Sequence, residues 1–253
     1  MRFASLGSGS RGNATLVQWQ DTLVMVDCGF SAKEVDVRLA RIGLSGKQLS
    51  GIVVTHEHGD HISGVGVLAR KYQLPVWMTV GTAKDFRGGK LPQLHYYHGH
   101  EPFSIGDITI QPFTVPHDAR EPCQLVFDNG QHKLGILTDV GSLTPHIIEM
   151  LDGCDALMLE CNHDVGMLER GPYPLSLKQR VGGRLGHLSN TQAAELLSQM
   201  DHSRLQHLVA MHLSEQNNSE MLARSTLSEV LECEQDWIGI ADQEFGFAWR
   251  ELR

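Results

Sequence analysis

Four side chains that can bind metal ions fall within six consecutive positions near the end of the first quarter of the chain. They are His56, His58, Asp60 and His61. Neutral imidazole nitrogens and carboxylate oxygens are ligands that proteins use for zinc, manganese and iron. At this density and spacing we interpret the segment as a metal site, in preference to a solvated turn that is rich in histidine.

The elements on either side of this segment predict how it is positioned. The apolar, β-branched residues 52–54 come directly before it and predict a buried strand, and residues 62–72 after it predict a helix. The ligands would therefore lie on a strand-to-helix turn, at the carboxyl end of the strand, where α/β folds place their sites. A helix that begins near Asp60 also directs its positive dipole end at the site, which favours a carboxylate and neutral imidazoles.

The rest of the chain predicts a mixed α/β protein with no internal repeat, low-complexity tract or linker. Predicted strands, the first of them an edge strand, cover residues 1–6, 14–18, 22–26, 75–79, 108–113, 123–128, 133–138, 156–160, 208–211 and 245–249. Predicted helices cover residues 31–42, 142–151, 190–200 and 219–233. We interpret residues 85–100 as irregular and residues 162–186 as a long loop. This order of elements is compatible with two facing sheets that are covered by helices.

Composition bounds the class of protein. The chain has 253 residues, of which 41% are hydrophobic and 20% charged, and this suits a single domain over residues 1–253. The first dozen residues lack the apolar stretch of a signal peptide, and no run approaches the ~18 apolar residues of a membrane span. Five scattered cysteines without a Cys-x-x-Cys spacing fit reduced thiols, so we expect a cytoplasmic protein with no membrane partner. The net charge of −9 argues against tight nonspecific binding of nucleic acid, although bound cations would offset it locally.

The spacing His-x-His-x-Asp-His of residues 56–61 resembles the signature of the metallo-β-lactamase superfamily. The resemblance implies a four-layer αβ/βα sandwich of class α/β (α+β). It also implies a site for two divalent metal ions, with zinc, manganese and iron as the candidates. A histidine at position 61 is typical of the members of the superfamily that hydrolyse phosphodiesters and thioesters.

Three isolated side chains at predicted strand ends complete the ligand set that this resemblance implies. They are His117, Asp139 and His212. A lone histidine or aspartate at a strand end is more often solvated, but the superfamily supplies its third histidine, its bridging aspartate and its last histidine in this order. The implied division is His56, His58 and His117 on one metal, Asp60, His61 and His212 on the other, and Asp139 between them.

The same resemblance implies a mechanism. A hydroxide that bridges the metals would act as the nucleophile, because divalent ions lower the pKa of bound water to about 7. Asp60 would orient this nucleophile, and Asp27 would hydrogen-bond the metal turn or a ligand imidazole. The histidines without a matching pattern are interpreted as surface or capping residues, and they are His95, His98, His100, His132, His146, His202 and His207.

Several further segments together resemble a narrower family, the YycJ/WalJ proteins. They are residues 8–13, 26–29, 115–119, 137–141, 159–164, 186–190 and 210–218. The family is similar to the ribonuclease Z and ribonuclease J phosphodiesterases, and its members are associated with 5′-to-3′ exonuclease activity on DNA. The resemblance therefore implies a metal-dependent phosphodiesterase whose substrate is nucleic acid, DNA before RNA. At 253 residues the chain has no room for the large cap domain of ribonuclease J, so strand binding is left to its loops or to a partner.

His187 occupies the place where ribonuclease Z carries a His-Ser-Thr segment. This implies a role as general acid toward the leaving oxygen, with Glu160 as the residue that orients it. His163 is a weaker alternative for the same role. The plain alternative for His187 is the flank of a helix that is capped by Ser189 or Asn190.

The loop before His187 is basic in an otherwise acidic chain. Residues 170–187 carry four cations and no acidic residue. Cations beside a hydrolytic site suit a phosphate backbone, so we predict that Arg180 and Arg184 bind substrate, together with Asn190. The alternative is a solvated face. For residues 85–100, which include Tyr96 and Tyr97, we prefer a plain surface loop over a base-stacking surface.

Two other functions stay open at this point. A hydrolase of a small cyclic phosphodiester, lactone or thioester is compatible with the ligands. Thioesterases of the glyoxalase II type, however, place their third histidine in a Gly-His-Thr context, whereas His117 follows a proline. A noncatalytic metal-binding regulator would lack one or more ligands, and all seven are present here.

Overall fold

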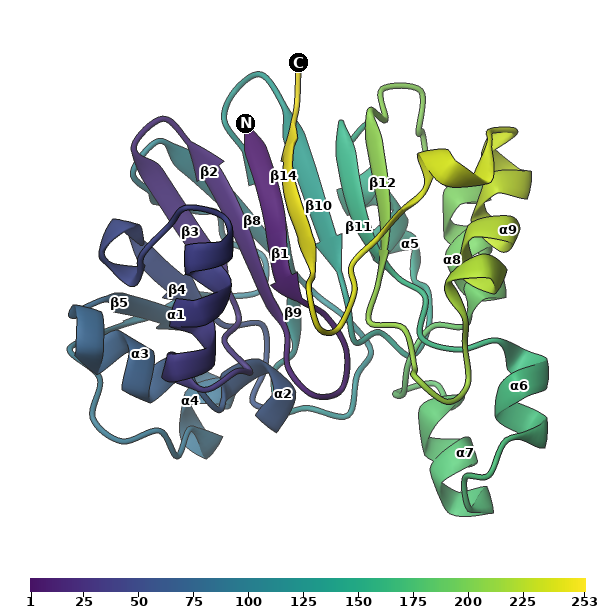
Figure 1. The fold of residues 1–253 in the computed structure, drawn as a ribbon, viewed down its shortest axis with the longest axis horizontal. Coiled ribbons are helices and arrows are strands. Elements are labelled where there is room, and N and C mark those ends of the chain that lie inside the picture. Colours follow the sequence, from purple (N-terminus) through teal and green to yellow (C-terminus); the bar gives the residue numbers. More distant parts are fainter.

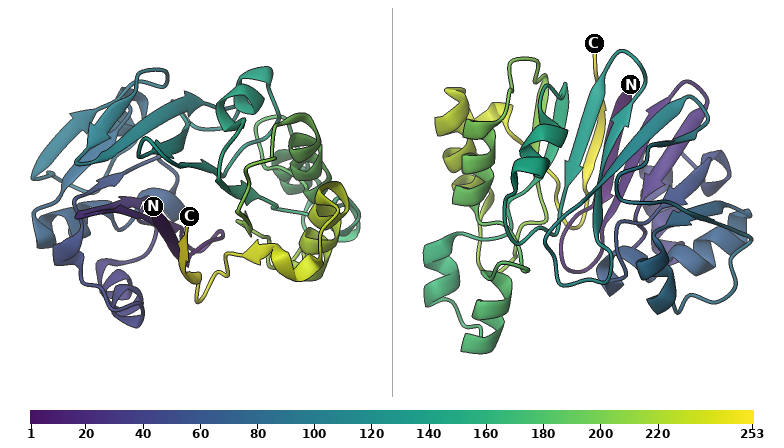
Figure 2. Two further views of the ribbon diagram at one scale, coloured as in Figure 1. Left: turned by 90° about the horizontal axis from the view of Figure 1, so that it is seen from above. Right: turned by 180° about the vertical axis from the view of Figure 1, so that it is seen from behind.

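The computed structural model describes residues 1–253 and consists of two seven-stranded sheets that face each other, with helices on both outer faces (Figure 1 and Figure 2). The strands of the first sheet, in spatial order, are β14 (Phe247–Glu251), β1 (Arg2–Gly7), β2 (Ala14–Trp19), β3 (Thr22–Val26), β4 (Gly51–Val53), β5 (Pro75–Met78) and β6 (Gln93–Tyr96). Those of the second sheet are β13 (Gly239–Ile240), β12 (His207–Met211), β11 (Ala156–Glu160), β10 (Lys133–Leu137), β9 (Cys123–Asp128), β8 (Ile108–Thr114) and β7 (Phe103–Ile105).

The helices form two groups, one for each sheet (Figure 1). Beside the first sheet lie α1 (Ala32–Arg41), α2 (Gly59–Ile62), α3 (Val65–Tyr72) and α4 (Val80–Asp85). Beside the second lie α5 (Pro145–Leu151), α6 (Val165–Arg170), α7 (Leu175–Val181), α8 (Asn190–Gln199) and α9 (Glu220–Leu231). None of these helices has the length and the apolar character needed to cross a membrane.

Three hydrophobic clusters separate the four layers. One lies between the first sheet and its helices, one between the two sheets, and one between the second sheet and its helices. On β3, Leu23 and Met25 join the outer cluster, whereas Val24 and Val26 join the central cluster. This follows from the two-residue period of a strand that is buried on both faces. The packing confirms the predicted αβ/βα sandwich.

Strand direction determines where the site lies. In the first sheet β3, β4 and β5 are parallel, and in the second sheet β10, β11 and β12 are parallel. Parallel strands end at the same edge of a sheet, so the loops that follow them lie close together.

Some predicted elements are wrong in detail. The helix predicted over residues 62–72 is divided into α2 and α3 near Gly64, where an added Cβ would lie 1.9 Å from the carbonyl oxygen of Phe30. The first strand is not at an edge, because β14 pairs with it in antiparallel orientation. The helix predicted from residue 142 begins only at Pro145, because Thr144 caps it.

Two stretches that we interpreted as irregular contain regular structure. Residues 85–100 include β6, and residues 162–186 include α6 and α7, which project at the lower right in Figure 1. Helix α7 buries none of its residues, so its sequence has no apolar period that would indicate a helix. Of the two tyrosines near β6, Tyr97 is buried and donates to the carbonyl oxygen of Val54, so it cannot stack on a base.

Candidate metal centre

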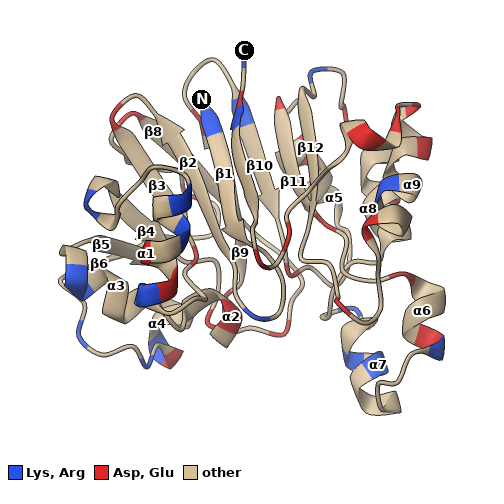
Figure 3. Ribbon diagram, viewed as in Figure 1, with Lys and Arg blue, Asp and Glu red and all other residues tan.

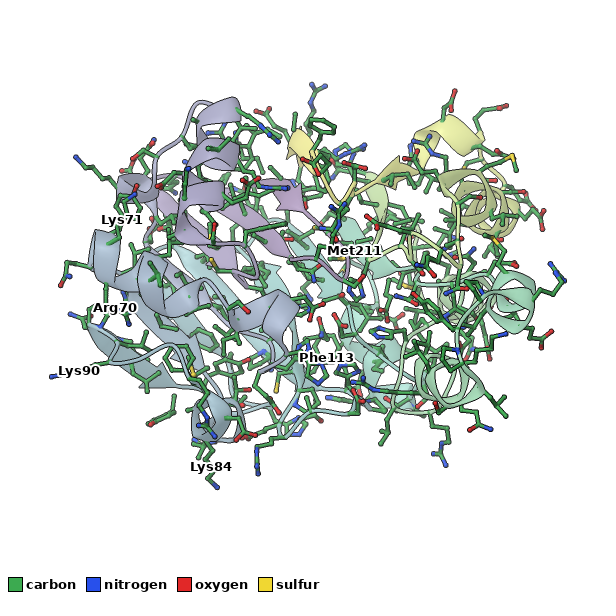
Figure 4. All side chains as sticks on the ribbon, turned by 60° about the horizontal axis from the view of Figure 1, so that its bottom comes forward. Arg70, Lys71, Lys84, Lys90, Phe113 and Met211 are labelled. Carbon is green, nitrogen blue, oxygen red and sulfur yellow. The ribbon has the colours of Figure 1, made fainter.

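The candidate ligands lie at one edge of the sandwich, where the carboxyl ends of strands from both sheets meet. The turn of residues 56–61 follows β4, and His117, Asp139 and His212 follow β8, β10 and β12. Figure 4 turns this edge toward the reader, with Met211 at the end of β12 labelled. Residues far apart in the sequence therefore come together as predicted.

The first group of ligands consists of the imidazoles of His56, His58 and His117, whose ligand nitrogens all lie within 4.8 Å of one another. His56 is fully buried. Its Nδ1 lies 2.9 Å from the Thr55 hydroxyl, and its Nε2 has no hydrogen-bond partner. Nδ1 of His117 donates to the carbonyl oxygen of Gly186, and its Nε2 faces Nδ1 of His58 at 3.1 Å. Buried polar atoms normally have partners, so these converging nitrogens fit a metal ion.

The second group consists of Asp60, His61, Asp139 and His212, whose ligand atoms also lie within 4.8 Å of one another. Nε2 of His61 lies 2.9 Å from the Asp139 carboxylate and 3.5 Å from that of Asp60. Nε2 of His212 is buried without a hydrogen-bond partner, 3.5 Å from the Asp60 carboxylate. Two imidazoles and two carboxylates form a mixed nitrogen and oxygen set that suits a divalent ion.

Asp139 lies between the two groups. One carboxylate oxygen is 2.9 Å from Nε2 of His61, and the other is 4.0 Å from Nε2 of His117 in the first group. Asp139 and His212 both have left-handed backbone conformations, with φ of 54° and 55°. Each such conformation costs on the order of 1–3 kcal/mol in a residue other than glycine and persists where the surrounding structure enforces it. Its occurrence at two candidate ligands indicates a functional constraint.

Burial and charge set the protonation of the two groups in opposite directions. Burial, reinforced by neighbouring His61, holds the pKa of His56 well below its usual value, so this imidazole is neutral and able to bind a metal. Burial also opposes charge on His212, but Asp139, Asp60 and Glu160 outweigh it and raise the pKa of His212 to about 10. The carboxylates of the second group therefore favour a cation, either a proton on the imidazole or a metal ion that displaces it.

Two buried carboxylates hold the ligand imidazoles in place. Asp27 accepts hydrogen bonds from the backbone N–H and hydroxyl of Thr55 and from Nδ1 of His61, the last at 2.7 Å. Glu160 accepts from Nδ1 of His212 at 3.0 Å and from Nδ1 of His187 at 2.8 Å. The contacts that we predicted for Asp27 and Glu160 are therefore present. Because each carboxylate accepts a hydrogen bond from the Nδ1 atom of a histidine, the Nε2 atom of that histidine is left free to face the site.

A cleft of about 410 Å³ opens over the two groups. His187 lies in its wall with 22% of its side chain exposed. Burial acts to lower the pKa of His187, but Glu160 and Asp139 outweigh it and raise the pKa. Tyr173 and Arg180 from the α6–α7 region line the same cleft, and Figure 3 shows that the charges on α7 are basic.

The three residues predicted to contact the substrate differ in whether they line the cleft. Arg180 lines the cleft, and its Nε donates to Asp118 at 2.8 Å. Arg184 is exposed but does not line the cleft. Asn190 is buried, and its side-chain amide exchanges hydrogen bonds with that of Asn218. Asn190 is therefore not available to a substrate, and its prediction as a substrate contact is withdrawn.

Sequence reasoning missed the role of Asn13, which touches the centre. Asn13 is buried, and its Nδ2 lies 3.1 Å from Nε2 of His61 and 3.3 Å from the backbone oxygen of Asp60. Its Oδ1 accepts from Ser8 and Gly9, which fixes the side chain. Residues 8–13 carried part of the family resemblance, but nothing in the sequence assigned a role to Asn13 within them.

Comparison with known proteins agrees with this geometry. Residues 22–213 match the β-lactamase superfamily domain, so the chain belongs to this superfamily and is a metal-dependent hydrolase. It is 39% identical over 236 residues to the exodeoxyribonuclease YycJ of Bacillus anthracis, covering 92% of this chain and 89% of the relative. It is 35% identical over 232 residues to the exodeoxyribonuclease WalJ of Streptococcus pneumoniae, covering 89% and 86%. Within the superfamily, the chain therefore belongs to the YycJ/WalJ family.

Solved structures support the fold. The metallo-β-lactamase fold protein YhfI from Bacillus subtilis superposes with a TM-score of 0.76 over 99% of both chains, at 19% sequence identity. The short form of human tRNase Z superposes with a TM-score of 0.70 over all of both chains, at 15% identity. At these identities the likeness concerns the fold alone.

Proposed function

We propose that this protein is a binuclear metal-dependent exonuclease that shortens DNA from the 5′ end. The observation that carries the proposal is the adjacency of two ligand groups with Asp139 between them, in a chain that is similar over most of its length to exodeoxyribonucleases. In the proposed assignment His56, His58 and His117 would hold one ion, Asp60, His61 and His212 would hold the other, and Asp139 would be shared by the two sites. Zinc, manganese and iron suit these donors.

When bound, the ions supply Lewis acidity toward the phosphate and lower the pKa of water. The side chains of the protein would orient the attacking water and protonate the leaving oxygen. Asp60, the member of the second group that lies 3.5 Å from Nε2 of His61, lines the cleft and would orient the attacking water. Glu160 holds Nδ1 of His187, which leaves Nε2 of His187 to deliver a proton to the leaving oxygen.

Contacts to the substrate come from the α6–α7 region in this proposal. Arg180 offers a guanidinium at the cleft, and its partner Asp118 also lies 3.8 Å from Nε2 of His58. A phosphate of the strand would compete with Asp118 for this guanidinium. Arg184, outside the cleft, is proposed to contribute only to the longer-range attraction of the backbone. A DNA substrate and five free cysteines fit the expected cytoplasmic location.

The test is a polarity assay. Duplex DNA labelled at the 3′ end, with and without a 5′-phosphate, is incubated with the protein and Mn²⁺ or Zn²⁺, beside His58→Ala as a control. We expect stepwise shortening from the 5′ end that the substitution abolishes. Intact DNA and RNA together with rapid cleavage of bis(p-nitrophenyl) phosphate would instead identify a hydrolase of small phosphodiesters.

A further inference from the structure

A second cavity of about 640 Å³ lies beside the metal cleft, among α6, α7 and the start of α8. Figure 1 shows α6 and α7 at the lower right, below α8. The residues that line the cavity and matter here are His163, Val165, Leu175, Lys178, Gln179 and Gln192. Its volume is in the range of sites for small molecules, on the order of 300–1,000 Å³.

Only a thin wall separates this cavity from the metal cleft. Asn162 lines the cleft and His163 lines the cavity, and the same holds for Val181 and Gly182. Consecutive Cα atoms are about 3.8 Å apart, so the two spaces are neighbours on the two sides of one segment of chain. A molecule in the cavity would therefore lie next to a group bound at the metals.

His163 gives the cavity an unsatisfied polar group. Its side chain is buried, with the residue 3% exposed, and its Nδ1 has no hydrogen-bond partner. Its Nε2 faces Gly182, where an added Cβ would lie 3.8 Å away. Because buried polar atoms normally have partners, an unpaired imidazole at the wall of a cavity is typical of a site that a polar ligand completes.

The lining suits an uncharged nucleoside. Val165 and Leu175 are 45% and 71% exposed and offer apolar surface to the faces of a base. The amide of Gln179 offers a donor and an acceptor to its edges, and Gln192, whose Oε1 accepts from Ser189 in the cap of α8, adds the donor Nε2. Nζ of Lys178 donates to the backbone oxygen of Glu169 and is therefore already paired. The carboxylate of Glu169 also lines the cavity and would repel an anionic ligand.

The position of His187, the proposed general acid, indicates which nucleoside of the DNA strand would occupy the cavity. In the proposed function His187 gives its proton to the leaving oxygen, and Ser189, two residues further on, lines the cavity. The leaving group of a 5′-to-3′ exonuclease is the 3′-oxygen of the terminal nucleotide. We propose, resting on the proposed function, that this cavity binds the 5′-terminal nucleoside of the strand and so directs cleavage to the first phosphodiester.

The chemical step balances with water as the co-reactant. The oxygen of water bonds to phosphorus as the bond from phosphorus to the 3′-oxygen breaks. His187 donates one proton to that oxygen, the attacking water loses one to solvent, and solvent restores the proton of His187. The products are a nucleoside 5′-monophosphate and a shortened strand with a 5′-phosphate.

The experiment fills the cavity with a larger side chain and does not change the candidate metal ligands. Val165→Trp places a large side chain at the mouth, and Val37→Trp on α1, also at a valine that is 45% exposed, is the matched control. Deoxyadenosine, which has no phosphate to bind the metals, is titrated calorimetrically into metal-loaded protein. We expect saturable binding to the wild type and V37W, weakened by about tenfold or more in V165W. Metal content and melting temperature verify that V165W is folded.

A second measurement compares the release of a 5′-terminal nucleotide that carries a base with one that is abasic. The wild type and V37W should release the nucleotide with a base faster by about tenfold, and V165W should lose the preference. Absence of deoxyadenosine binding, equal binding by V165W, or equal release by the wild type would overturn the inference. If DNA stays intact but deoxyadenosine binds as expected, the proposed exonuclease fails while the cavity stands as a nucleoside site.

Discussion

The two groups of ligands differ in charge and in how the protein holds them. The first presents only imidazoles, and those of His56 and His117 are held by a hydroxyl and a backbone carbonyl. The second adds the carboxylates of Asp60 and Asp139, and its imidazoles are held by Asp27 and Glu160. Carboxylates are therefore concentrated at the second group, whereas the first has the Asp118 carboxylate beside it, 3.8 Å from Nε2 of His58 and paired with Arg180. We expect the second group to bind its ion more tightly and with release of a proton.

The largest loss of activity is expected from substitution of Asp139, the residue that lies between the two groups. Asp139→Ala removes the carboxylate between them, so hydrolysis of DNA should fall by at least about a thousandfold and at least one metal ion should be lost. Metal content by emission spectroscopy and the rate on DNA check both parts. A variant that kept full activity would disprove the assignment of Asp139.

A smaller but specific effect is expected from the carboxylate that supports the second group. Glu160→Gln keeps the shape but removes the charge that holds His187 and His212. We expect metal affinity at the second group and the rate on DNA each to fall by about 10–100-fold, with the first group unaffected. Glu149→Gln, at an exposed glutamate on α5, is the control and should change neither. Equal loss from both groups in E160Q would refute the asymmetry.

Because the second group holds a proton on His212, we predict that the stability of the metal-free protein depends on pH. The pKa of His212 is about 10 in the folded protein, above its ordinary value of 6.5, because nearby carboxylates outweigh burial. A raised folded-state pKa contributes stability that is fully present below pH 6.5 and is lost as the pH rises through about 10. The melting temperature of metal-free protein should therefore fall over this window, and added Mn²⁺ should flatten the decline. A metal-free protein whose melting temperature does not change over this window would contradict the charge assignment.

The smallest effect concerns the substrate side. Arg180→Ala should raise KM for DNA a few-fold, on the order of 3–10, and reduce the dependence of binding on salt by about one charge. Arg184→Ala, outside the cleft, should change KM less. Stability should change little in both variants, because Arg184 is exposed and the Arg180 side chain is 63% exposed, although its partner Asp118 is only 31% exposed. Identical effects of the two substitutions on KM would show that position in the cleft does not matter.

The metal turn could be predicted from sequence because its evidence is local. Four ligand types fall within residues 56–61, directly after an apolar strand, and the structure places them together. The distant ligands needed the resemblance to a family, because a lone histidine such as His212 carries no signal of its own. The same resemblance predicted that Asp27 holds a ligand imidazole and that Glu160 holds His187, but only the structure shows that Glu160 also holds His212.

The substrate side could not be predicted to the same depth. Helix α7 lies outside the core and buries no residue, so no apolar period marks it. Asn190 was predicted at the surface of the site, but its amide pairs with that of Asn218, which is distant in sequence. Asn13 sits in a glycine-rich turn whose backbone is easily predicted, while its contact to His61 crosses from one turn to another. In each case a contact between distant segments decides the role.

The number of bound ions per chain and their magnetic coupling test directly whether Asp139 joins two metal sites. The protein is dialysed against Mn²⁺, the ions per chain are counted, and the electron paramagnetic resonance spectrum is recorded. Two ions per chain with an exchange-coupled spectrum are expected, because Asp139 lies between the two groups. One ion per chain, or two that give the hyperfine pattern of isolated Mn²⁺, would contradict a bridged binuclear centre.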